Sequence, residues 1–363
     1  MKSGLLVCAV LAACGGSQAS AEGSGADAGS DGSGGSSSSS SSGSSSSSSG
    51  GGTTTDSGTS THDAGGTTGN DAGGTPHDAG MGGIDVGAGS GAKYASDGPV
   101  PYTVQHMTLS NAGRSWGESV YVPTSSGLHP VVTVNAGTQQ VNAAYAIYGK
   151  RLASYGIIAL TQDDEGALAP TPNVVDDVTY VITTWVPANL ASSADMTRVG
   201  LSGHSRGGKA TLLAAENALK GKVKAWFGLD PVDVDFLGTP GALPNIGTIG
   251  IPLGFAGATV SSNCSPANAN YEVYYGAAAP PDVAVTVEGA GHFDFLDQSQ
   301  AVAESYCTPE GTVDGTLALD TAAHYLMAFF ARELLGDSSV GPAFDGVGAQ
   351  ADIAAGVIAV ESK

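Results

Sequence analysis

The chain has 363 residues, with 34 acidic and 13 basic side chains and a formal net charge of −21. This acidic balance argues against binding to nucleic acid and against docking on anionic lipid through charge, but it is compatible with a neutral substrate. The length that follows a low-complexity N-terminal part suits one sizeable domain.

The first 14 residues have the pattern of a signal peptide. A positive charge precedes an apolar stretch from Leu5 to Ala13, which is too short to span a bilayer. The segment Leu11-Ala12-Ala13-Cys14 resembles the bacterial lipobox, in which the cysteine is lipidated and becomes the mature N-terminus. The resemblance predicts an exported lipoprotein, held at the membrane only through acyl chains on Cys14, with its domain facing the periplasm or the cell surface. Ordinary secretion, with cleavage near Ala19 to Ala21, is the alternative.

Residues 15–95 have the composition of a linker. Between 15 and 92 the chain is mainly Gly, Ser, Thr, Ala and Asp, with eight acidic residues, no Lys or Arg and no aromatic residue. Such a segment cannot bury enough apolar surface to offset the entropy of ordering, so we expect a disordered tether. The globular domain is predicted over 96–340, and the sequence does not indicate the structure of the extension at 341–363.

The globular part opens with two predicted strands at 102–110 and 118–124, joined through a turn. Strands and helices then alternate. Strands are expected at 129–137, 157–162, 197–203, 223–230, 251–257 and 282–291, and helices at 142–156, 173–186, 206–221 and 321–336. This order predicts an α/β fold with a mostly parallel central sheet covered by helices on both faces.

A G-x-S-x-G motif, Gly203 to Gly207, lies between a predicted strand and a predicted helix. Small residues in this motif allow a sharp turn that lifts the serine hydroxyl out of the sheet. The helix that begins near Arg206 directs its positive end at the serine. We therefore predict that Ser205 is a nucleophile. A second match, Gly113 to Gly117, has no helix after it, so Ser115 is expected in a hairpin turn.

A serine hydroxyl needs a base within hydrogen-bond reach, and in this architecture the chain order is Ser, acid, His. His292 follows the last predicted strand in a Gly-rich segment and is the predicted base. His324 lies within a predicted helix and, like His204 beside the serine, is expected to pack. Asp230 is the predicted acid because it ends a strand at the edge where sites of open α/β sheets cluster, and Asp233 is the alternative.

The oxyanion hole should use two backbone N–H groups. Arg206, after the nucleophile, is predicted to supply one. Thr138, in the loop after the strand at 129–137, is predicted to supply the other, and Gly137 would allow close approach of the carbonyl oxygen.

The sequence indicates the roles of several other residues less specifically. Asp163, Asp164 and Glu165 follow a strand at the same edge, and we expect a solvated acidic loop there, with a site for a cation or a polar substrate group as the alternative. Tyr145, on a predicted helix, is expected to pack in the core, with a platform for the substrate as the alternative. Cys264 and Cys307 form an even pair in an exported chain and are predicted to form a disulfide. This pair offers too few ligands for zinc, so no metal is expected.

Three segments resemble a known family: GHSRGGK (203–209), GLDPVD (228–233) and GHFDFLD (291–297). They are similar to the chlorophyllase branch of the α/β-hydrolases, with cutinase-like polyester hydrolases and dienelactone-hydrolase-like esterases as more distant relatives. The similarity runs from about Pro99 to Gly336. In one departure, Ala136-Gly137 stands where many relatives have His-Gly.

The resemblance implies an α/β-hydrolase fold and hydrolysis of a small-molecule or polymeric carboxylic ester through an acyl-enzyme, without a cofactor. It places the nucleophile on Ser205, the acid on Asp230 and the base on His292. A monomer is expected. An amidase or lactonase of the same fold is one alternative, and a surface binding or adhesion module without catalysis is another.

Overall fold

The structure is a computed structural model, which describes residues 93–164, 170–234, 241–297 and 307–363. The predicted signal peptide with Cys14, most of the predicted linker, and Glu165 lie outside the described residues. In the described part of the chain, no helix has the length and apolar character needed to cross a membrane.

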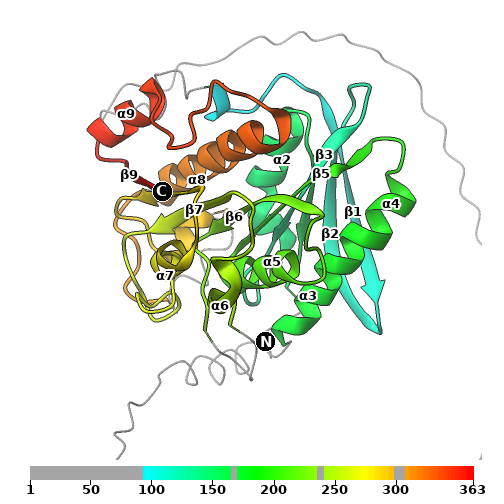
Figure 1. The fold of residues 1–363 in the computed structure, drawn as a ribbon, viewed down its shortest axis with the longest axis horizontal. Coiled ribbons are helices and arrows are strands. Elements are labelled where there is room, and N and C mark those ends of the chain that lie inside the picture. The colour runs from blue at the N-terminus through cyan, green and yellow to red at the C-terminus, as the bar shows by residue number, and fades with distance from the viewer. Residues whose placement is uncertain (1–92, 165–169, 235–240, 298–306) are drawn as a thin grey trace, which may run out of the picture. The chain divides into compact units, whose positions relative to one another are not determined.

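The described residues form one nine-stranded sheet in the order β1-β2-β4-β3-β5-β6-β7-β8-β9 (Figure 1). The strands are β1 (Tyr102–Asn111), β2 (Arg114–Pro123), β3 (His129–Asn135), β4 (Ile158–Gln162), β5 (Ala194–His204), β6 (Val223–Leu229), β7 (Leu253–Ala258), β8 (Asp282–Val287) and β9 (Ile358–Ser362). Strands β3 to β8 pair in parallel. The pairs β1–β2, β2–β4 and β8–β9 are antiparallel. The prediction of a mostly parallel sheet is confirmed.

Helices cover both faces of this sheet (Figure 1). They are η2 (Asn142–Tyr145), α2 (Ala146–Ser154), α3 (Thr171–Tyr180), η3 (Val181–Trp185), α4 (Val186–Asn189), α5 (Arg206–Glu216), α6 (Leu243–Ile246), α7 (Tyr271–Ala277), η4 (His292–Phe295), α8 (Gly315–Phe330), η6 (Ala331–Leu335) and α9 (Val347–Ala354). Neighbouring residues of β3 face opposite sides, as strand geometry requires. Val132 packs in the cluster of α2 and α8, whereas Val131 packs in the cluster of α3 and α5. The parallel strands are thus buried on both sides.

The hairpin between β1 and β2 is tighter than predicted. Asn111 pairs with Arg114, which leaves a two-residue turn of Ala112 and Gly113, both with positive φ (50° and 81°). Such turns match the twist of the flanking strands. Ser115 therefore lies on β2 and not in the turn, so that prediction was wrong.

Folded structure extends beyond the predicted limits of 96–340 at both ends. Tyr94, inside the predicted linker, is 3% exposed and its hydroxyl bonds to Asp337. The C-terminal extension forms α9 and then β9, which pairs with β8. An edge strand of five residues carries too little periodicity to be recognised from the sequence.

A buried carboxyl group on β2 gives a pH-dependent stability. Glu118 is 1% exposed, and burial, reinforced by Asp163 and Asp177, raises its pKa well above 4.5 despite a bond from the Trp116 indole N–H. The folded state therefore keeps a proton that the unfolded chain releases above pH 4.5, so this group lowers stability as the pH rises.

We expect Glu118→Gln, which keeps an acceptor for the indole, to raise the melting temperature at pH 8 by about 2 °C or more, with the gain shrinking towards pH 4. Scanning calorimetry at both pH values measures this. Parallel pH profiles for variant and wild type would contradict it.

Candidate active site

Ser205 occupies a strained turn between β5 and α5. Its φ is +54° and its ψ is −124°, an unusual conformation for a residue with a side chain. The Ser205 N–H donates to the Leu229 carbonyl oxygen of neighbouring β6 at 3.1 Å, which ties the turn to the sheet. The predicted strand–serine–helix arrangement is therefore present, and the N-terminus of the 11-residue helix α5 follows the hydroxyl directly.

The glycines of the motif provide space for close backbone contacts. A Cβ atom at Gly203 would lie 2.4 Å from the carbonyl carbon of Gly207. A Cβ atom at Gly207 would lie 2.3 Å from the Asn135 carbonyl oxygen and 2.5 Å from that of Ala136. The end of β3, the end of β5 and the start of α5 thus meet at distances that exclude side chains.

Asp230 and His292 come together after the ends of β6 and β8. His292 begins η4, and its Nδ1 lies 2.6 Å from Oδ2 of Asp230. His292 is 3% exposed and Asp230 is 0% exposed. Since β5, β6 and β8 are parallel, this pair and Ser205 all lie at the carboxyl edge of the sheet, where sites of such folds form.

Backbone contacts fix the orientation of the Asp230 carboxylate. Its own N–H donates to the Ala256 carbonyl oxygen at 2.7 Å, and its Oδ1 accepts from the Ala258 N–H at 3.3 Å. The alternative acid, Asp233, instead pairs with Lys209, whose Nζ lies 2.8 Å from its Oδ1. Only Asp230, of these two, contacts His292 in the described structure.

His324 is buried at 2% exposure on α8. Its ring lies beside that of Tyr325, with the ring centres 4.6 Å apart. It is therefore a residue of the helix interior, as expected from the sequence.

The loop after β3 lies directly against the serine turn. A Cβ atom at Gly137 would be 3.0 Å from the Ser205 Cβ and 2.8 Å from Nδ1 of His204. Thr138 follows at an exposed turn, and Arg206 lies on the other side of Ser205. The two predicted oxyanion donors are thus on the two segments that flank the serine.

A buried chain of hydrogen bonds links this loop to the predicted base. The Gly137 N–H donates to the Tyr145 hydroxyl (3.0 Å), which lies 3.0 Å from Nδ1 of His204. Nε2 of His204 lies 2.9 Å from the His292 carbonyl oxygen. Because a carbonyl oxygen only accepts, Nε2 carries a proton, and in the neutral ring Nδ1 then accepts from the tyrosine hydroxyl.

The buried surroundings of His204 favour the neutral form of its imidazole. Burial, reinforced by neighbouring His292, lowers its pKa well below 6.5. The prediction that His204 and Tyr145 pack in the core does not include the hydrogen bonds that they form. No local sequence pattern signals it, since the contacts join residues that lie far apart in the chain.

The acidic run after β4 is not a solvated loop in its described residues, so that prediction was wrong. Asp163 accepts from the backbone N–H groups of Asn142 (2.5 Å) and Gly117 (3.0 Å). The Asp164 side chain is 1% exposed and forms an ion pair with Arg206. These carboxylates accept from backbone N–H groups of neighbouring segments at a half-buried edge of the sheet.

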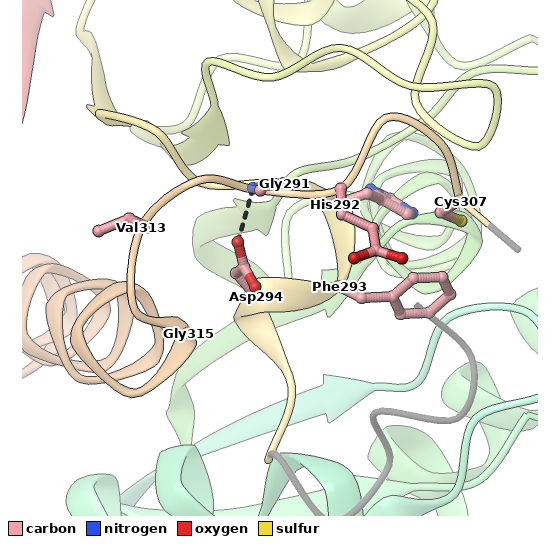
Figure 2. A pocket seen from close by; sticks show the side chains of 9 residues that line it. Gly291, His292, Phe293, Asp294, Cys307, Val313 and Gly315 are labelled. Carbon is pink, nitrogen blue, oxygen red and sulfur yellow. Dashed lines mark hydrogen bonds between the residues drawn. The ribbon is translucent and has the colours of Figure 1, made fainter. Parts of the chain in front are cut away.

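A disulfide joins the segment between β7 and α7 to the segment that precedes α8. Cys264 and Cys307 form a disulfide with a Cα–Cα distance of 5.4 Å. Cys307, His292 and Phe293 help to line a cavity of about 170 Å³ (Figure 2). In Figure 2, Asp294 points back to Gly291, whose N–H donates to Oδ2 at 2.8 Å.

Among the described residues, no group of three or more His, Cys, Asp or Glu is placed to hold a metal ion.

The close contacts at Gly207 generate a first test. Gly207→Ala should push the loop after β3 away from the serine, lowering stability by about 1–3 kcal/mol and reducing any Ser205-dependent activity. Gly276→Ala on α7 is the matched control, since a Cβ atom there has nothing within 4 Å. Thermal denaturation and turnover measure the effect, and equal behaviour of the two variants would refute this account of the glycine.

The neutral His204 generates a second test. Below pH 6.5 the unfolded chain binds a proton at this residue that the folded state does not, so wild-type stability should fall as the pH falls. The loss from this group reaches about 1.4 kcal/mol at pH 5.5. His204→Gln should lose less stability between pH 8 and pH 5.5, as measured by urea denaturation. An undiminished pH dependence in the variant would argue against a neutral His204.

Known proteins match the region that contains this site. The family described as Chlorophyllase matches residues 96–340. Chlorophyllase type 0 of Chenopodium album is 25% identical over 201 residues (48% of this chain and 58% of its own length). Chlorophyllase-2 of Arabidopsis thaliana is 26% identical over 205 residues (49% and 64%). Cutinase 1 of Thermobifida cellulosilytica is 25% identical over 124 residues (33% and 47%).

The match therefore spans less than two thirds of the length of each of these relatives. The family match over residues 96–340 includes the strands from β1 to β8 and the segments of Ser205, Asp230 and His292. The mostly parallel sheet with helices on both faces is that of an α/β-hydrolase. The chain belongs to the chlorophyllase family.

Proposed function

We propose that the protein is a serine carboxylic-ester hydrolase that works through an acyl-enzyme, with Ser205, Asp230 and His292 as its triad. The observation that carries the proposal is the 2.6 Å contact between His292 Nδ1 and Asp230 Oδ2 at the same sheet edge as the strained serine turn. His204, the residue before Ser205, contacts the His292 backbone, so the serine and histidine segments are neighbours.

The first half of the reaction follows from the contact between His292 and Asp230. With its Nδ1 proton donated to Asp230, His292 has an unprotonated Nε2 that accepts the hydroxyl proton as Ser205 Oγ attacks the ester carbonyl. Asp230 holds the ring in orientation and stabilises the imidazolium that forms. His292 then gives its proton to the departing alcohol, which leaves the acyl group on Ser205.

The N–H groups of Arg206 and Thr138 stabilise the negative charge that develops on the carbonyl oxygen in this proposal. Each such donor contributes about a hundredfold or more to the rate. The positive end of α5 adds to the same field. Water then attacks the acyl-enzyme with His292 as its base, and the acid is released. The mechanism uses no cofactor.

The substrate and location belong to the same proposal. Relatives named chlorophyllase and cutinase support a small-molecule or polymeric ester as the substrate. We further propose a monomer that is exported and anchored through acyl chains on Cys14, with the Gly- and Ser-rich segment as its tether.

Removal of the nucleophile tests the function. Ser205→Ala should lower kcat on a short p-nitrophenyl ester by about 10⁴-fold or more, because the remaining groups cannot form an acyl-enzyme. Ser115→Ala is a matched control with the same G-x-S-x-G context, and it should retain wild-type turnover because its side chain is exposed on β2 and bonds to Ser110. Full activity of Ser205→Ala would sink the proposal.

A fluorophosphonate probe separates an enzyme from a binding module, since only an activated serine is labelled. Wild type should be labelled at Ser205, whereas a folded protein that stays unlabelled would favour the binding module. Comparing matched ester, amide and lactone substrates then distinguishes an esterase from an amidase or lactonase.

A further inference from the structure

The Asp164 carboxylate contacts the loop that carries one proposed oxyanion donor. Its Oδ2 accepts from the backbone N–H of Gln139 at 2.6 Å. Its own N–H donates to the Gln140 carbonyl oxygen at 3.0 Å. Gln139 directly follows Thr138, so both contacts act on the backbone next to that donor.

The same carboxylate contacts the segment that carries the other donor. Its Oδ1 accepts from the guanidinium of Arg206, the first residue of α5. The side chains of Arg206 and Asp164 are 10% and 1% exposed. An ion pair with so little contact with water is weakly screened.

The bridged loop needs an external restraint. Between Asn135, where β3 ends, and Asn142, where η2 begins, it has no regular structure of its own. Gln139 has a φ of +62°, a conformation that costs free energy for a residue other than glycine. The bond from its N–H to Asp164 favours this conformation and thereby fixes the direction of the adjoining peptide group.

We propose that Asp164 is a positioning residue that sets the separation of the two oxyanion donors by bridging the loop after β3 to the start of α5. This inference rests on the proposed esterase function. It predicts an effect on the transition state, where the oxyanion exists, and little effect on binding of the neutral ester. Asp164 itself contacts neither substrate nor reacting atoms in this scheme.

Asp164→Asn is the first test. Its amide oxygen can still accept from Gln139, but its NH₂ group faces the donor-only guanidinium of Arg206. We expect kcat for a short p-nitrophenyl ester to fall about tenfold to hundredfold, with KM changing less than about twofold. The inhibition constant of a trifluoromethyl ketone, which forms a tetrahedral oxyanion on the serine, should rise in parallel with the loss in kcat.

Three further variants make the result specific. Arg206→Met removes the guanidinium and keeps the backbone N–H, so it should reproduce the loss even if Asp164→Asn folds poorly. The double variant should lose no more than the more impaired single variant, because both changes break one interaction. Asp195→Asn is the matched control: it breaks the Arg198–Asp195 pair (2.7 Å) near the opposite end of β5 and should leave kcat unchanged.

The outcomes separate this inference from the proposed function. Full activity of Ser205→Ala would overturn both. An inactive Ser205→Ala together with wild-type kcat in folded Asp164→Asn and Arg206→Met would overturn the positioning role alone. Lower kcat with an unchanged inhibition constant for the ketone, or additive losses in the double variant, would also overturn it.

Discussion

The candidate site depends on the close approach of three backbone segments at the carboxyl edge of the sheet. The end of β3 packs on the start of α5 at Gly207, and the loop after β3 packs on the serine turn at Gly137. A side chain at either glycine would meet other atoms at less than 3.0 Å. This contact places peptide groups from two segments beside Ser205, which an oxyanion hole requires.

Backbone groups brought so close together need partners that local secondary structure does not supply. Tyr145 accepts from Gly137, and Asp164 accepts from Gln139, so two side chains from outside the loop satisfy two of its N–H donors. Each side chain also contacts a second part of the site, through His204 or Arg206. The polar groups around Ser205 thus form a connected set in which the loop, the helix start and the histidine segment restrain one another.

Much of the fold could be predicted because its signals are local. Apolar runs bounded by Gly and Pro marked β3, β4 and β6, and apolar periodicity marked α2 and α8. The short helices α6 and α7 and the edge strand β9 were not predicted, since a few residues carry little periodicity. The tight β1–β2 hairpin was also missed, because nothing in the pattern shows which residues adopt positive φ.

The sequence by itself determined that a serine follows a strand and precedes a helix, and that His292 lies in a Gly-rich segment after a late strand. It favoured Asp230 over Asp233 as the acid without excluding Asp233, and it could not assign a polar role to His204 or Asp164. The tertiary structure decided these points: Asp230 contacts His292, whereas Asp233 contacts Lys209. The physical reason is that a turn or a helix depends on neighbours along the chain, whereas a hydrogen bond between distant residues depends on how the strands are ordered and aligned in the sheet.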